Sequence, residues 1–132
     1  MKLFHAPDVA PETADPSNFR GRARVKRVAS VEGGEPLMVY WVDFEAGGRT
    51  NWHSHSGAQL LLVTEGRGRI QRWGEGVQEI GAGDVVHIGP GEKHWHGAAP
   101  GSRVAHFAVN IDVATTWLEP VSDEDYRRHE PR

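Results

Sequence analysis

The chain of 132 residues contains no cysteine. A disulfide framework, a thiolate metal site and a thiol nucleophile are therefore excluded. No apolar run approaches the ~20 residues that a membrane-spanning helix needs. The first ten residues also lack the apolar segment of a secretory signal. We therefore expect a cytoplasmic protein without a membrane partner.

Positive charge is also in short supply. The chain has 15 lysines and arginines against 18 aspartates and glutamates, a formal net charge of −3. This balance gives no electrostatic reason to expect nucleic acid as a partner, and it leaves a small-molecule substrate as the expected one. Four cations do cluster between residues 22 and 27, and we interpret them as the exposed edge of a strand.

Turn residues are plentiful, with 16 glycines and 8 prolines. They divide the chain into short segments rich in β-branched and aromatic residues, one about every 8–12 residues. This spacing predicts an all-β sandwich or barrel, and the length suits a single domain over residues 1–132. The barrel core is expected at about 37–111. The expected strands are 22–31, 37–45, 50–55, 59–64, 67–73, 77–80, 85–88, 94–98 and 103–111.

Two local signals complete the predicted fold. The pair Glu65-Gly66 is expected to form a turn between two strands. No long helix is expected before residue 115. Near the end of the chain, Ser122 followed by three acidic residues predicts the N-terminal cap of a short C-terminal helix.

Polar residues that bind metals recur in the middle of the chain. His53 and His55 are two apart in an expected strand, so their side chains project from the same face. Gln59 follows a reversal, and His94 comes from another strand. Three neutral imidazoles and one amide oxygen suit a divalent first-row metal: Mn, Fe, Co, Ni or Zn. The alternative, three structural histidines held by hydrogen bonds, fits this spacing less well.

The spacing of these residues forms two blocks. The first runs from Gly47 to Gly66 as glycine, five residues, His-x-His, three residues, glutamine, six residues, glycine. The second runs from Gly83 through a proline–glycine corner to His94. With these blocks the chain resembles the cupin superfamily, which implies a jelly-roll β-barrel. Gln59 stands where that family usually has glutamate, and Gly89 stands where it usually has proline.

Residues 83–100 and 121–128 narrow the resemblance to the small bacterial cupins that include the manganese-dependent (R)-hydroxynitrile lyases. This resemblance implies a homodimer or homotetramer joined through the N-terminal strand. It also implies that His106 accepts a proton near the metal. The metal ligands that it implies, with manganese the favoured ion, are His53, His55, Gln59 and His94.

We expect a substrate pocket beside the metal, lined by Tyr40, Val42, His96 and Asn110. The related lyases have a small residue where this chain has Tyr40. A tyrosine at that position would fill part of the pocket, or it would lend its hydroxyl group to the substrate.

Gln59 determines the charge of the predicted site. Because none of the ligands is anionic, the ion keeps its full +2 charge. A more positive ion is a stronger Lewis acid and prefers anionic ligands. We therefore expect a lyase-like enzyme that acts on a small oxygenated molecule, with His106 as the base. A metal-dependent dioxygenase and a non-enzymatic module that binds a small ligand are the alternatives, because one barrel hosts many functions.

Overall fold

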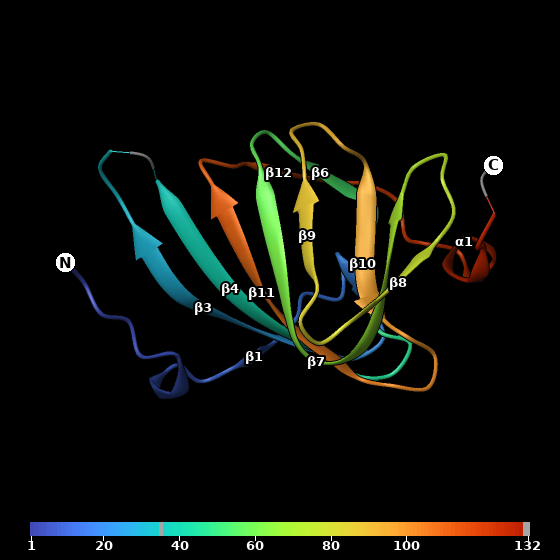
Figure 1. Cartoon of the computed structure of the whole chain (residues 1–132), viewed down its shortest axis with the longest axis horizontal. Coiled ribbons are helices and arrows are strands. Elements are labelled where there is room, and N and C mark those ends of the chain that lie inside the picture. Colours follow the sequence, from blue (N-terminus) through green and yellow to red (C-terminus); the bar gives the residue numbers. More distant parts are fainter. Residues whose placement is uncertain (35, 131–132) are drawn as a thin grey trace.

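The computed structural model describes residues 1–34 and 36–130. Its strands form a curled antiparallel sheet that makes a half-barrel, as expected for a jelly roll (Figure 1). The elements are η1 (Ala6–Asp8), β1 (Glu12–Thr13), β2 (Phe19–Arg20), β3 (Ala23–Val31), β4 (Leu37–Phe44), β5 (Arg49–Thr50), β6 (His53–His55), β7 (Gln59–Arg72), β8 (Gln78–Gly81), β9 (Val85–Ile88), β10 (His94–Ala98), β11 (Val104–Ile111), β12 (Thr115–Trp117) and α1 (Asp123–Arg127).

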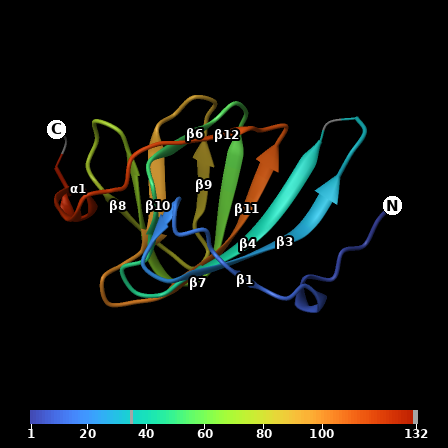
Figure 2. The same cartoon turned by 180° about the vertical axis from the view of Figure 1, so that it is seen from behind.

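The strands are hydrogen-bonded in the order β1-β3-β4-β11-β7-β10-β5-β2. β9 pairs with the first part of β7 and β8 with its last part, while β6 lies between β10 and β12. β7 therefore belongs to both layers of the half-barrel. Seen from behind, β3 and β4 stand at the end of the molecule that carries the N-terminus, and α1 stands beside β8 at the other end (Figure 2).

β7 corrects one expectation, because residues 59–72 form one strand and not two strands joined by a turn. The register between β7 and β11 passes over Thr64, which makes a bulge. Gly66 follows with a φ of 77°, and a Cβ there would lie 1.9 Å from the carbonyl oxygen of Arg103. Glycine is required at this position because no larger residue fits. The bulge and Gly66 carry the strand from one layer to the other.

The segment 50–55 corrects a second expectation, because it is divided between β5 and β6. The backbone N–H of Asn51 donates to the carbonyl oxygen of Asn18 at 2.8 Å, and that of Trp52 donates to Glu119 at 2.9 Å. Both donors are therefore engaged by loops outside the sheet. Because β6 is separate from β5, its three residues pair with β12. This pairing places β12 beside His53 and His55.

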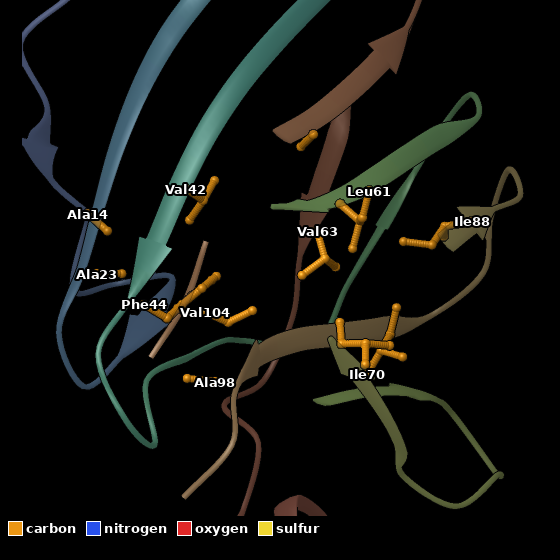
Figure 3. Close-up of a cluster of buried hydrophobic side chains, with 12 residues drawn as sticks. Ala14, Ala23, Val42, Phe44, Leu61, Val63, Ile70, Ile88, Ala98 and Val104 are labelled. Atoms are coloured by element: carbon orange, nitrogen blue, oxygen red, sulfur yellow. The ribbon is translucent and has the colours of Figure 1, made fainter. Parts of the chain in front are cut away.

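The main hydrophobic core lies between the two layers (Figure 3). Phe44, Leu61 and Val104 are wholly buried there. The Phe44 ring lies 5.9 Å from the rings of both His96 and His106, so this core forms one side of the histidine cluster. Burial of such side chains stabilises the barrel by about 1.5–3 kcal/mol each.

The C-terminal helix α1 confirms its predicted cap, since the Ser122 hydroxyl accepts from the backbone N–H of Asp125 at 3.1 Å. The Tyr126 side chain packs into a second buried cluster with two tryptophans, Trp52 and Trp95. Within residues 1–34 and 36–130, no helix is both long and apolar enough to cross a membrane.

Candidate metal centre

Five buried histidines from three strands meet inside the half-barrel. β6 supplies His53 and His55, β10 supplies His94 and His96, and β11 supplies His106. His53 and His94 are cross-strand partners, and their ring centroids lie 4.2 Å apart. The His55 ring lies 5.0 Å from His53 and 5.3 Å from His94. The alternation of each strand sends all five side chains inward.

Backbone carbonyls orient two of these rings. Nδ1 of His53 lies 2.9 Å from the carbonyl oxygen of Asn51, and Nδ1 of His94 lies 2.8 Å from that of Glu92. A carbonyl oxygen only accepts, so Nδ1 carries the proton in both rings and Nε2 keeps a lone pair. Hydrogen bonding of one ring nitrogen in this way is typical of histidines that bind metals through the other.

Gln59, the first residue of β7, is held with its amide oxygen toward the histidines. Its Nε2 donates to Oδ1 of Asn110 at 2.7 Å, and its Oε1 lies 3.1 Å from Nε2 of His55. Nδ1 of His55 is in turn 2.9 Å from the hydroxyl of Thr115. Asn110 and Thr115 therefore fix the orientation of two expected ligands.

Burial keeps these imidazoles neutral. It lowers the pKa of His53 well below the ordinary 6.5, and the neighbouring His94 lowers it further. Burial also lowers the pKa of His55, and it lowers the pKa of His94 to about 4. The lone pairs that a metal requires are therefore available at neutral pH.

The residues present fit a divalent ion. Nε2 of His94 is a buried polar atom with no hydrogen-bond partner among the described residues. Such an atom is costly unless something binds it. One ring nitrogen each of His53, His94 and His96 lie within 4.8 Å of one another. Imidazole nitrogens together with the amide oxygen of Gln59 form a donor set suited to a first-row metal.

His96 and His106 form a buried pair beside these ligands. Nε2 of His106 lies 3.2 Å from Nδ1 of His96. Burial lowers the pKa of His106 to about 4. Burial, followed by the neighbouring His106, lowers the pKa of His96 well below its ordinary value. Both rings are therefore neutral at pH 7.

A cavity of about 1040 Å³ opens onto the centre. All four expected pocket residues line it, as do three of the four expected ligands: Tyr40, Val42, His96, Asn110, His53, His55 and Gln59. The Tyr40 hydroxyl donates to Sδ of Met38 at 2.8 Å, which turns it along β4. His106 is only 1% exposed and reaches the cavity through its hydrogen bond to His96.

Sequence reasoning missed two residues of this site. Thr115 lies opposite His55 in the register of β12 and β6, and the Trp117 ring lies 4.7 Å from the His53 ring. Both belong to β12, a three-residue strand that lacks a motif and was not expected. The only signal available was the β-favouring run Thr115-Thr116-Trp117 itself.

The fold and this centre define the class of protein. Residues 31–113 match the model of the Cupin domain, so the chain belongs to the cupin family. The chain is 52% identical over 115 residues to an (R)-mandelonitrile lyase from Granulicella tundricola, a match that covers 83% of this chain and 86% of that protein.

Solved structures agree with this assignment. A cupin-like protein from Thermotoga maritima superposes with a TM-score of 0.85 at 39% identity, covering 89% of this chain and 92% of its own. A polyketide cyclase from Streptomyces resistomycificus superposes with a TM-score of 0.64 at 20% identity, covering 96% and 90%. The second likeness concerns the fold alone.

Proposed function

We propose that this chain is a metal-dependent lyase that cleaves an aromatic α-hydroxynitrile into an aldehyde and cyanide. The observation that carries the proposal is the buried cluster of histidines with Gln59, opening onto a cavity. The similarity to an (R)-mandelonitrile lyase supports this substrate class. A cavity of about 1040 Å³ is large enough for a molecule of that size.

The residues proposed to hold the ion are His53, His55, Gln59 and His94, with Mn²⁺ the favoured ion. When bound, a divalent ion supplies Lewis-acid stabilisation of negative charge on the substrate oxygen. The chain contributes to that effect by offering only neutral donors, so no ligand charge offsets the charge of the ion. Asn110 contributes by holding Oε1 of Gln59 toward His55.

His106 is the proposed base. Its neutral ring takes the proton of the substrate hydroxyl, the carbon–carbon bond to the nitrile breaks, and the electrons of that bond leave with cyanide as the carbonyl forms. His106 then returns the proton to cyanide. Its position supports this role, because its Nε2 is one hydrogen bond from His96 on the cavity wall. The apolar core at Phe44 keeps bulk water from the ring.

The direct test is cleavage of (R)-mandelonitrile by the Mn²⁺-loaded protein, followed by the absorbance of benzaldehyde. We expect aldehyde release, and a loss of about 10²–10⁴-fold in kcat for His106→Ala, the usual contribution of a general base. His87→Ala, which removes an exposed imidazole, is the matched control.

Two results would contradict the proposal. An absence of aldehyde with stoichiometric metal would exclude the lyase activity, and oxygen consumption by the Fe²⁺-loaded protein would then favour a dioxygenase. Full activity of His106→Ala would exclude His106 as the base.

A further inference from the structure

The sequence predicts only that His96 lines the pocket, but its ring makes further contacts within the histidine cluster. It lies between the ligands and the proposed base. Its ring centroid is 5.4 Å from His53 and 4.9 Å from His106, and its ring is stacked on that of His94 at 6.0 Å. It is 5% exposed, and it lines the cavity.

In two expected ligands, His53 and His94, a backbone carbonyl accepts from Nδ1, and in His96 Nδ1 is the nitrogen that meets Nε2 of His106. His55 differs, because its Nδ1 meets the Thr115 hydroxyl and its Nε2 meets the amide oxygen of Gln59. A neutral imidazole has one N–H and one lone pair, so a proton on Nδ1 leaves the lone pair on Nε2. With the proton on Nδ1 and directed at Nε2 of His106, the lone pair on Nε2 of His96 would be as free to bind a metal as those of His53 and His94.

We propose that His96 is an additional metal ligand through Nε2, that its Nδ1–H donates to Nε2 of His106, and that this arrangement is the resting form of the centre. The cluster of nitrogens within 4.8 Å that the structure brings together is His53, His94 and His96. In the resting form the ion would have two sets of ligands that share His53 and His94. The first set adds His55 and Gln59, and the second adds His96.

The hydrogen bond from His96 also restricts the access of substrate to His106. This part of the inference rests on the proposed function, in which His106 is the base. The lone pair of His106 Nε2 is occupied while His96 donates to it. A substrate hydroxyl can reach that lone pair only after the His96 ring has turned away. His96 would therefore protect the centre when the cavity holds no substrate, and it would give way when substrate enters.

Co²⁺ is the probe for the test, because its visible absorption depends on the number and kind of its ligands. The parent protein and His96→Phe, which keeps an aromatic ring but has no donor atom, are titrated with Co²⁺ against a competing chelator. We expect His96→Phe to lower the affinity at least about 10-fold, in the range found when groups supporting a metal site are removed. We also expect a shift of the absorption band.

A double variant distinguishes the contribution of Gln59 to metal binding from that of His96. Gln59→Leu alone should lose less affinity than Gln59→Leu with His96→Phe, because His96 still completes the site in the single variant. His5→Ala removes an exposed imidazole that is distant in sequence from the cluster, and it is the control for adventitious binding. An affinity within twofold of the parent and an unchanged band in His96→Phe would overturn the proposal.

A further variant keeps the proposal testable if His96→Phe does not fold. His106→Leu leaves His96 in place and removes its acceptor. It should weaken Co²⁺ binding several-fold while the band remains that of the parent, whereas unchanged affinity would overturn the proposal. These readouts use no substrate. A failure of mandelonitrile cleavage with the expected Co²⁺ results would therefore contradict the proposed function alone.

Discussion

At the scale of single residues, the centre depends on side chains that bind no ion themselves. Asn110 and Thr115 each hydrogen-bond an expected ligand and fix the direction in which its donor atom points. The ligand residues could be predicted because a period of two puts His53 and His55 on one face. Thr115 could not, because its role arises from strand pairing across 60 residues of sequence.

The variant Asn110→Leu tests whether Asn110 holds Gln59 in the orientation that metal binding requires. The variant keeps the size of the side chain but removes the oxygen that accepts from Gln59, so the amide oxygen of Gln59 is no longer held in place. We expect metal affinity to fall about 10-fold or more, as for other residues that support metal ligands. Competition with a chelator measures the effect, and Gln78→Leu, at an exposed amide on β8, is the control. Equal affinities in the parent and both variants would show that Asn110 does not orient Gln59.

At the scale of elements, most strands could be predicted because glycine and proline mark their ends. The long strand β7 could not, because Glu65-Gly66 has the local composition of a turn. What decides its conformation is the close approach of the Arg103 carbonyl from a segment distant in sequence. The same reasoning applies to β12, whose pairing with β6 is a tertiary contact.

The bend in β7 gives a matched pair of substitutions. Gly66→Ala introduces a Cβ against the Arg103 carbonyl at a positive φ, and we expect it to lower the free energy of unfolding by about 3 kcal/mol or more. Gly74→Ala also lies at a positive φ, but its Cβ meets nothing within 4 Å, so backbone strain alone should cost about 1 kcal/mol. Urea unfolding measures both. Equal losses would mean that the contact with Arg103 does not require glycine.

The attachment of α1 depends on pH through Tyr126, whose hydroxyl donates to the carbonyl oxygen of Ala98 at 2.5 Å. Burial raises the pKa of this phenol above its ordinary value of 10.0. The folded protein therefore holds this proton more tightly than the unfolded chain, so the contribution is complete below pH 10 and is lost as the pH rises through the folded pKa.

Comparison with Tyr126→Phe isolates this contribution. The parent should exceed the variant in free energy of unfolding by about 1 kcal/mol at pH 8. That difference should shrink as the pH rises above 10. Urea unfolding across this range measures it, and a constant difference would show that the hydroxyl does not titrate with folding.

At the scale of the whole molecule, the ends of the chain complete the wall of the centre. Phe19 of β2 and Trp117 of β12 are in ring contact at 5.7 Å, and Trp117 also meets His53. The cavity is lined by the N-terminal arm as well as by the barrel strands. Sequence periodicity cannot predict such contacts, because it describes which way a residue faces and not which distant segment covers it.

The outer edge of β3, opposite the edge that pairs with β4, is a candidate surface for the association of two copies of the chain. β1 pairs with only Arg24 and Val25, and β3 continues to Val31. We propose that a second copy of the chain covers this edge through its N-terminal segment, because an uncovered strand edge readily pairs with another chain. Light scattering after size-exclusion chromatography should give the mass of a dimer or tetramer. Removal of residues 1–15 should lower that mass, and a monomeric parent at micromolar concentration would contradict the proposal.

The central claim is that these buried side chains hold one divalent ion, and metal stoichiometry tests it most directly. The metal-free protein is loaded with Mn²⁺, passed through a desalting column and analysed for bound metal by mass spectrometry. We predict one ion per chain in the parent and in His87→Ala, and almost none in His94→Ala, whose unfolding curve should show that it remains folded. A folded His94→Ala that retains one ion, or a parent that retains none, would contradict the account.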